Sequence, residues 1–376
     1  MRVCLVTETY FPQVNGVSRT LGQLVRHLTE RGDLVQLVHP DYGEIAAANT
    51  LLVRAASPPF YPELHLPLPP FAAVHRAIDA FAPEIVHIAT EATLGFSLLR
   101  DAQRKKIPVV SSFHTNFDQY SAHYRVGFTR GTIWRYLRWF HNRTVETYVP
   151  SRATIADLRS RGFERLVFWP RGVDGRLFRP DRPGGQELRR ALGFGPGDVV
   201  IAYVSRIAAE KNIAYLADAL VIVERERPRT RLLFVGDGPA RPSLETRMGS
   251  NASFVGYRSG EDLADHYAAA DLFVFSSLTE TFGNVVLEAM ASGLPVVALR
   301  AGGVGDTVRP GVTGALVEPN AAPAEFAHAL ITLIDDHDLR RRTSQAARAY
   351  ALSQSWDEIM GSLRDHYQRV IKSSRR

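Results

Sequence analysis

Residues 272–288 read LFVFSSLTETFGNVVLE, and this stretch decides the fold class. Its first four residues, Leu272–Phe275, form a short apolar run bounded by polar residues, which is typical of a buried strand. Apolar residues at helical spacing begin after Gly283, so a helix is expected over residues 284–292. A buried strand that leads through a polar loop into a helix is the repeating unit of a parallel α/β sheet.

The same alternation extends in both directions from this stretch. Proline and glycine crowd residues 170–185, which indicates a linker between two doubly wound, Rossmann-like domains at 1–170 and 171–354. From about residue 321 the pattern is helical only, and a final helix is expected at about 355–372. Strands are expected at 2–7, 34–38, 85–88, 109–112, 199–204, 232–235 and 295–298, and further helices at 17–28, 212–226 and 260–270.

Composition narrows the class of protein. The chain has 376 residues, of which 45% are hydrophobic and 22% charged, so it can build more than one core and is not a disordered protein. Its one cysteine, Cys4, allows no intramolecular disulfide, which fits a reducing compartment. No apolar stretch is long enough to cross a membrane, and the N-terminus has the pattern of a strand rather than a signal peptide. A cytoplasmic protein is therefore expected.

Positive charge is concentrated in the first half of the chain. Residues 1–180 carry 22 Lys and Arg against 15 Asp and Glu, within a net charge of +6 for the whole chain, which favours an anionic partner. A helix is expected over Thr132–Tyr148, and the segment from residue 130 to 143 has a basic and aromatic face: Arg130, Trp134, Arg135, Arg138, Trp139 and Arg143. That face suits an anionic membrane surface, as in a peripheral protein at the inner face, or is simply a solvated helix face. No recognition motif accompanies the charge, so nucleic acid is not expected.

Candidate binding residues follow two of the expected strands. Arg206 and Lys211 share the loop after strand 199–204, where a planar guanidinium and a point charge suit phosphate oxygens. Gly283 and Asn284 stand at the start of a helix, whose free N–H groups attract anions. Carboxylates can each bind a vicinal diol, so Glu280 and Glu288 could hold sugar and ribose hydroxyls. The alternatives are an ordinary exposed basic loop, a helix-capping acid and a solvated glutamate.

These motifs together resemble a known family. The Arg-x4-Lys loop, the segment Val235–Pro239 and the Glu-x7-Glu element occur in the order and spacing of the retaining glycosyltransferases of family 4, which have the GT-B fold. The resemblance covers nearly the whole chain. It implies that Arg206 and Lys211 neutralise the donor diphosphate, that Glu280 contacts donor-sugar hydroxyls and that Glu288 holds the ribose. It also implies donor contacts from the backbone of Phe282, Gly283 and Asn284, and a last helix that returns to the first domain across a central cleft.

The resemblance assigns residues in the first domain as well. Gly16, at the start of the first helix, would touch the diphosphate, although many members have a second glycine where this chain has Asn15. His114, in the segment Phe113–Asn116, would lie beside the site of sugar transfer and bond a donor hydroxyl. Arg171 stands where the family's linker commonly has asparagine, a variant similar to a subgroup of lipid mannosyl- and sulfoquinovosyl-transferases. Arg171 either touches substrate or braces the hinge.

The expected function is therefore transfer of a sugar, with retention, from a nucleoside-diphosphate sugar to a hydroxyl of a lipid or glycan acceptor. GDP-mannose is favoured as donor and a UDP-sugar is second. The resemblance implies no cofactor and no required metal; the segment Asp336–Asp338 is interpreted as a solvated turn, and Gly236–Gly238 lacks the third glycine of a dinucleotide motif. A nucleotide-sugar epimerase, a sugar phosphorylase and a non-catalytic sugar-nucleotide-binding protein remain as alternatives.

Overall fold

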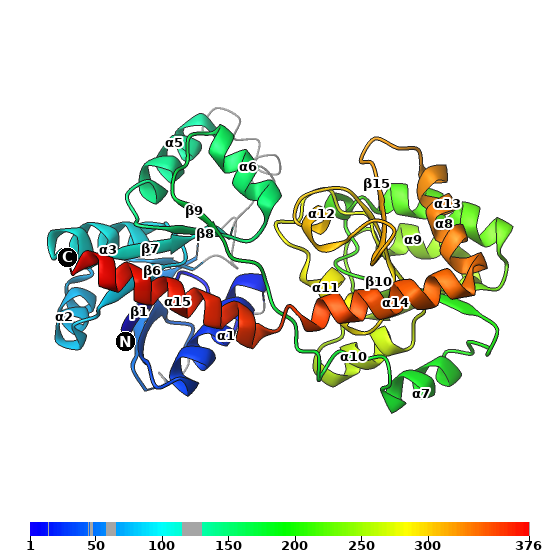
Figure 1. Cartoon of the computed structure of the whole chain (residues 1–376), viewed down its shortest axis with the longest axis horizontal. Helices are drawn as coiled ribbons and strands as arrows, with labels where there is room; N and C mark the ends of the chain where they lie inside the picture. Colours follow the sequence, from blue (N-terminus) through cyan, green and yellow to red (C-terminus); the bar gives the residue numbers. More distant parts are fainter. Residues whose placement is uncertain (14, 44, 46–47, 58–64, 115–129, 376) are drawn as a thin grey trace. The chain divides into compact units, whose positions relative to one another are not determined.

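The computed structural model describes residues 1–13, 15–43, 45, 48–57, 65–114 and 130–375. The chain divides into two compact units, one formed by Met1–Arg171 with Asp357–Arg376 and the other by Gly172–Trp356 (Figure 1). Among the described residues, no helix combines the length and apolar character that crossing a bilayer requires.

The first unit is built on a seven-stranded sheet whose neighbouring strands are all parallel. The chain begins in the middle of this sheet, where Val3 pairs with Val35 on one side and Ile85 on the other. In sheet order the strands are β3 (Thr50–Val53), β2 (Leu34–Pro40), β1 (Arg2–Val6), β6 (Ile85–Ile88), β7 (Val109–Ser112), β8 (Thr147–Val149) and β9 (Leu166–Phe168). A small antiparallel pair, β4 (Ala55–Ala56) and β5 (Leu66–Pro67), stands apart from it.

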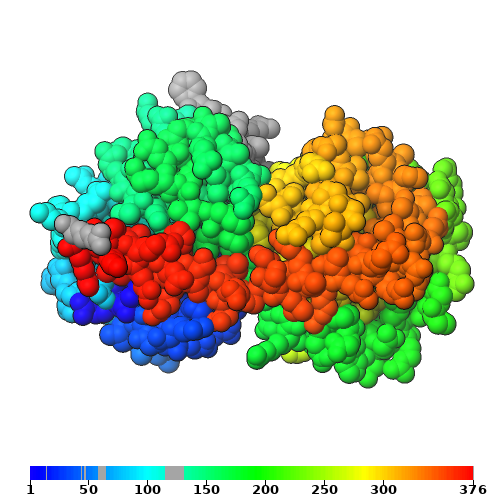
Figure 2. Space-filling view, viewed as in Figure 1, coloured from blue at the N-terminus to red at the C-terminus, as the bar shows by residue number. Residues whose placement is uncertain are grey.

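Helices on the faces of this sheet include the last helix of the chain. They are α1 (Gly16–Glu30), α2 (Ala72–Phe81), α3 (Thr93–Arg104), α5 (Arg130–His141), α6 (Arg152–Ser160) and α15 (Trp356–Ser374). Helix α15 buries a stripe that includes Ile359, Leu363 and Tyr367, spaced four residues apart. Arg364 adds an ion pair to Asp33, with Nε 2.6 Å from Oδ2. The opposite side of α15 is exposed at the surface of the first unit (Figure 2, red).

The second unit contains a six-stranded parallel sheet with the strand order of dinucleotide-binding folds. In sheet order the strands are β12 (Ala252–Gly256), β11 (Thr230–Val235), β10 (Val199–Val204), β13 (Leu272–Phe275), β14 (Val296–Leu299) and β15 (Gly314–Val317). The chain runs outward from β10 to one edge and then crosses back to β13. The strand order therefore reverses between the adjacent strands β10 and β13, and the loops at their carboxyl ends lie where such folds bind ligands.

Apolar strands are covered on both faces in this second unit. Val200 and Ala202 of β10 belong to one core cluster, while Ile201 and Tyr203 belong to the cluster on the opposite face. Strands buried on both faces are continuous apolar runs, which is why these strands are visible in the sequence. The helices are α7 (Pro183–Ala191), α8 (Ile213–Glu226), α9 (Arg241–Met248), α10 (Gly260–Ala268), α11 (Asn284–Ala291), α12 (Val304–Thr307), α13 (Pro323–Asp335) and α14 (His337–Leu352), with short 3₁₀ turns at Ala209–Lys211 and Gly249–Asn251.

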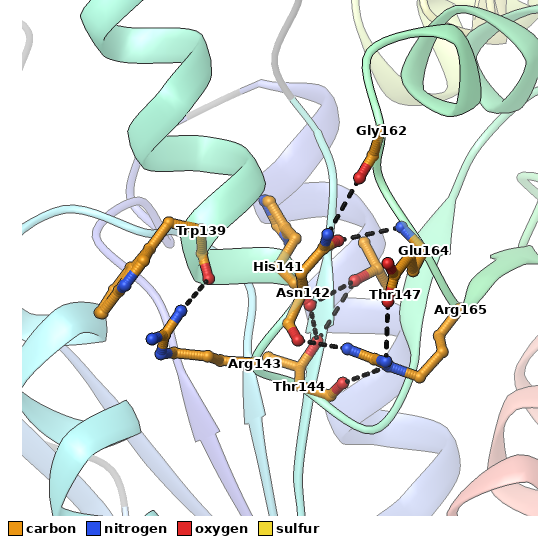
Figure 3. A network of polar contacts seen from close by, with 9 residues as sticks. All are labelled: Trp139, His141, Asn142, Arg143, Thr144, Thr147, Gly162, Glu164 and Arg165. Carbon is orange, nitrogen blue, oxygen red and sulfur yellow. Dashed lines mark hydrogen bonds and ion pairs between the residues drawn. The ribbon is translucent and has the colours of Figure 1, made fainter.

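One predicted helix extends beyond the helix that the structure shows. The helix expected over Thr132–Tyr148 is α5, which ends at His141, and Tyr148 lies fully buried in β8. A polar network ends the helix (Figure 3): the Asn142 side chain donates to the Gly162 carbonyl at 2.9 Å and accepts the Glu164 N–H at 2.9 Å. These bonds turn the chain toward β8, whose aromatic and β-branched residues favour a strand.

Candidate active site

Two loops of the second unit meet where the strand order reverses. Strands β10 and β13 are direct neighbours, with Ile201 paired to Leu272, so the loops at their carboxyl ends lie side by side. Arg206 and Lys211 come from the loop after β10, and Glu280 comes from the loop after β13. The structure thus brings together basic and acidic residues that lie about seventy positions apart in the sequence.

Lys211 and Glu280 form the central contact of this site. The Lys211 ammonium donates to Oε1 of Glu280, and the two side chains are 19% and 21% exposed. The Ser276 hydroxyl donates to the Lys211 carbonyl at 2.8 Å, and the Ser277 hydroxyl donates to Oε1 of Glu280 at 3.4 Å. Both members of the pair are therefore held in place and still reach solvent.

Arg206 is the exposed cation of the same loop. Its side chain is 70% exposed and lies 3.5 Å from Oε1 of Glu210, a loose contact that leaves the guanidinium accessible to an anion in solution. The backbone of the loop is better fixed, because the Tyr203 hydroxyl donates to the Arg206 carbonyl at 3.0 Å. The Ile207 N–H also donates to the carbonyl of Asp237 at 2.9 Å.

Gly236 and Gly238 allow the loop after β11 to approach the Arg206 loop closely. A Cβ atom at Gly236 would lie 2.0 Å from the Ser205 carbonyl oxygen, and one at Gly238 would lie 2.3 Å from that of Ile207. Both glycines also have positive φ angles, +138° and +157°. The two glycines therefore support the Arg206 loop, because they let the loop after β11 pack closely against it.

The start of α11 offers backbone N–H groups beside Lys211 and Glu280. Gly283 occupies the cap position with φ +85°, and no side chain caps this helix. Asn284 follows, and its buried side-chain oxygen has no hydrogen-bond partner within the described part of the chain. Phe282 packs in the core at 7% exposure, so a ligand would meet its backbone. An uncapped helix start with an unpaired polar atom can accommodate an anionic, hydroxylated ligand.

Glu288 is a buried carboxylate further along α11. It is 8% exposed, and the hydroxyl of Tyr267 on α10 donates to its Oε2 at 3.1 Å. A carboxylate at this burial needs hydrogen bonds to remain charged, and Tyr267 supplies one of them. Sequence analysis identified Glu288 but not Tyr267, which lies in another helix.

Gly302 and Gly303, in the loop after β14, fix the backbone of Glu280 and were not identified from the sequence. The Gly303 N–H donates to the Glu280 carbonyl at 3.1 Å. A Cβ at Gly302, where φ is +51°, would lie 2.0 Å from that same oxygen. The sequence feature that could have identified them is a pair of adjacent glycines directly after an expected strand.

In the first unit, Gly16 is the first residue of α1, and the side chain of Asn15 caps this helix. The Asn15 side-chain oxygen accepts the N–H of Val17 at 3.0 Å and that of Ser18 at 2.9 Å. The Asn15 N–H in turn donates to the Ser18 hydroxyl at 3.1 Å, which completes a capping box. Two first-turn N–H groups are thus already used, in contrast to α11.

His114 follows β7 and is bonded through both ring nitrogens. Its Nε2 lies 2.7 Å from the Ser112 hydroxyl, and its Nδ1 lies 3.0 Å from Nη2 of Arg171. Burial, with Arg171 as a nearby positive charge, lowers the pKa of His114 well below its usual range. The ring is therefore neutral at physiological pH. Thr115 and Asn116 of the same sequence motif lie outside the described residues.

Arg171 lies inside the first unit rather than at its surface. It is 5% exposed, donates to the carbonyl of Trp169 at 3.0 Å and stacks 4.9 Å from the centre of the Trp169 ring. Burial lowers its pKa to about 9. Its contacts hold the end of the first unit to His114, as a bracing residue would.

The aromatic residues of α5 pack within the protein. Trp134 stacks on Phe113, and the guanidinium of Arg161 lies 4.2 Å from the centre of its ring. Arg143 covers the Trp139 ring at the same distance and also donates to the Trp139 carbonyl (Figure 3). The two tryptophans are therefore part of the fold, and the exposed charges of this face among the described residues are Arg135, Arg138 and Arg143.

The segment Asp336–Asp338 forms the start of α14. Asp336 caps the helix by accepting the Leu339 N–H at 2.8 Å, and Asp338 lies 3.1 Å from Arg341. Across the described ranges, no cluster of three or more His, Cys, Asp or Glu side chains is arranged to hold a metal ion.

Comparison with known proteins identifies the family. Residues 14–176 match the model of glycosyltransferase family 4, and residues 198–336 match that of glycosyl transferases group 1. A GDP-mannose-dependent alpha-mannosyltransferase of Mycobacterium tuberculosis is 34% identical over 98% of this chain and 97% of its own length. This chain belongs to glycosyltransferase family 4.

Two further proteins are similar to this family 4 glycosyltransferase, one in sequence and one in structure. The sulfoquinovosyl transferase SQD2 of Arabidopsis thaliana is 33% identical over 97% of this chain and 72% of its own length. The crystal structure of Anabaena Alr3699/HepE in complex with UDP has a TM-score of 0.79 at 21% identity, and covers 98% of this chain and 100% of that chain. The likeness shows that the two Rossmann-like halves have the GT-B fold.

Proposed function

We propose that this glycosyltransferase transfers a mannosyl residue from GDP-mannose, with retention, to a hydroxyl of a lipid or glycan acceptor. The observation that carries the proposal is the Lys211–Glu280 pair beside the uncapped start of α11. One cation and one carboxylate together match a donor with a charged diphosphate and a hydroxylated sugar.

The diphosphate would bind to positive groups of the second unit. Arg206 is exposed and loosely paired, so it can turn to phosphate oxygens at small cost. Lys211 already bonds Glu280 and has further N–H donors for a phosphate. The N–H groups and dipole at the start of α11 add partial positive charge.

The sugar and the ribose would be held by the two glutamates. Glu280 is supported by Ser277 and by the glycines after β14, which fixes a carboxylate that can accept two sugar hydroxyls. The unpaired side-chain oxygen of Asn284 would accept another hydroxyl. Glu288, positioned by Tyr267, would accept the ribose hydroxyls.

The chemical step would depend on stabilising the departing nucleoside diphosphate. Arg206, Lys211 and the start of α11 would offset the charge that develops on its β-phosphate, and they need no metal to do so. The departing phosphate would take the proton of the acceptor hydroxyl as that hydroxyl attacks from the same face. Gly16 and His114 would complete the donor contacts from the first unit.

The choice of donor and acceptor follows the relatives. The mannosyltransferase relative, which matches along nearly the whole chain, is named for its dependence on GDP-mannose, so GDP-mannose is the first candidate and a UDP-sugar the second. A lipid acceptor would bring the protein to the inner face of a membrane from the cytoplasm. The exposed Arg135 and Arg138 would then meet anionic headgroups.

The test is a transfer assay with GDP-mannose and, separately, UDP-glucose. A glycerolipid in mixed micelles and a soluble mannoside serve as acceptors, and the anomeric configuration of the product is read by NMR. We expect acceptor-dependent release of GDP, an α-linked mannoside, and a loss of about a hundredfold or more in kcat for Glu280→Gln. Transfer from UDP-glucose alone would replace the donor assignment, and a β-linked product would exclude retention.

A further inference from the structure

A chain of buried side chains connects His114 to the last helix of the protein. Nε2 of His114 contacts the Ser112 hydroxyl, and that hydroxyl lies 2.9 Å from Nε2 of His87. Nδ1 of His87 bonds the hydroxyl of Tyr367 on α15. His87, Ser112 and Tyr367 are fully buried, so the middle of this hydrogen-bond chain is not exposed to solvent.

Arg171 fixes the first hydrogen bond of this chain, and the other directions follow if the Ser112 hydroxyl donates to His87. A guanidinium can only donate, so Nδ1 of His114 must accept and the single proton of the neutral ring lies on Nε2. That proton is donated to Ser112, whose own hydroxyl proton is then donated to Nε2 of His87. His87 consequently carries its proton on Nδ1 and donates it to Tyr367.

Trp169 encloses the chain on one side. The centre of its ring lies 6.0 Å from that of His114, 6.1 Å from that of His87 and 6.0 Å from that of Tyr148. Arg171 lies over the same ring and donates to the Trp169 carbonyl. Both histidine rings therefore pack edge-on against a buried indole.

We propose that Arg171, Ser112, His87 and Tyr367 are positioning residues that hold His114 as a neutral ring with its proton on Nε2. Helix α15 thereby contributes to the site through Tyr367, although it is far from His114 in the sequence. The proposal gives Arg171 a specific task, since replacement by a residue that can accept a hydrogen bond would no longer fix the direction of the chain. The expected effect on catalysis rests on the proposed function, in which His114 contacts the donor. The expected tautomers of His114 and His87 do not depend on that contact.

The tautomers are measured directly by long-range ¹H–¹⁵N correlation spectra of protein labelled at histidine. The spectra of His114→Gln and His87→Gln assign the two rings by loss of signal. We expect the Nε2–H form for His114 and the Nδ1–H form for His87 at pH 7. A proton on Nδ1 of His114, or a doubly protonated ring, overturns the proposal.

Two substitutions test the connection itself. Arg171→Met removes the donor that sets the direction, and we expect mixed tautomers at both His114 and His87. Tyr367→Phe removes the last acceptor, and we expect shifted ring nitrogens in His87 and a fall in kcat of about tenfold. Tyr148→Phe is the matched control, because Tyr148 is equally buried but its hydroxyl bonds Glu146 outside the chain.

The outcomes separate this proposal from the proposed function. If Tyr367→Phe and Tyr148→Phe have the same effect on the His87 nitrogens and on kcat, the positioning role is wrong. If the wild-type tautomers are as expected and respond to Arg171→Met, but no sugar is transferred from GDP-mannose or UDP-glucose, the hydrogen-bond chain stands and the proposed function fails.

Discussion

The Lys211 ammonium forms an ion pair with the Glu280 carboxylate, joining the loop after β10 to the loop after β13. Each side chain is about four-fifths buried, and each has a proposed role in donor binding of its own. The pair thus joins the two loops through the same groups that would bind the donor.

This pair gives the first prediction. In a double-mutant cycle of Lys211→Met and Glu280→Gln, we expect a coupling of roughly 1 kcal/mol in the free energy of unfolding, because the pair is partly desolvated. Urea unfolding of the four proteins measures it. Additivity within about 0.3 kcal/mol would show that the contact contributes nothing to the stability of the protein without donor.

Gly302→Ala tests the support of Glu280. The new Cβ would clash with the Glu280 carbonyl at a positive φ, so we expect destabilisation of about 1–3 kcal/mol and a loss of transfer activity. Gly311→Ala is the matched control, since Gly311 also has a positive φ, +73°, but a Cβ there would meet nothing within 4 Å. Equal effects of the two substitutions on activity would argue against a role for Gly302 at Glu280.

Tyr267→Phe tests the positioning of Glu288. Loss of the hydroxyl leaves a buried carboxylate with one donor fewer, so we expect a cost of about 1–3 kcal/mol in stability and weaker nucleotide binding. Tyr215→Phe, which removes a hydroxyl bonded to the Ala322 carbonyl on an exposed surface, should change neither by a measurable amount. Unchanged nucleotide affinity in Tyr267→Phe would argue against a role for Glu288 in binding the ribose.

Glu91 predicts a pH dependence of stability in the first unit. Burial, and secondarily the charge of Glu8, raises the pKa of Glu91 from 4.5 to about 8. Below pH 4.5 this group is protonated in both the folded and the unfolded chain. Between pH 4.5 and about 8 only the unfolded chain ionises freely, so folding loses stability as the pH rises.

Glu91→Gln removes that loss. We expect the variant to gain stability over the wild type as the pH rises from 5 to 8, by at most roughly 1.4 kcal/mol per pH unit. Unfolding by urea at three pH values measures the difference. Glu30→Gln, at an exposed position on α1, is the control and should show a flat difference. A flat difference for Glu91→Gln as well would contradict the burial argument.

Sequence periodicity predicted the central strands because they are buried on both faces. The expected strands at 199–204 and 272–275 coincide with β10 and β13, and the expected helices over 212–226, 260–270 and 284–292 appear as α8, α10 and α11. The short edge strands β9, β12 and β15 were not predicted, because three to five residues of mixed character give no clear period.

The candidate site was predictable where a motif is local and not where it depends on packing. Arg206, Lys211 and Glu280 follow strands, and the neighbouring positions of β10 and β13 bring them together. The supports of the two glutamates come from elsewhere in the chain: Tyr267 of α10 contacts Glu288, and Gly302 of the loop after β14 contacts Glu280. Arg171 was singled out by its departure from the family pattern, but its burial against Trp169 could not be read from the sequence.

The most direct test of the central claim is calorimetric titration with GDP and, separately, UDP, of the wild type, Arg206→Ala and Arg225→Ala. Arg225 is the matched control, an arginine of the same unit that is 77% exposed. We predict that GDP binds the wild type and Arg225→Ala alike, that its affinity falls about tenfold or more in Arg206→Ala, and that UDP binds more weakly. Binding of neither nucleotide above a weak, salt-sensitive level, or equal binding by the two variants, would contradict the donor site proposed at Arg206 and Lys211.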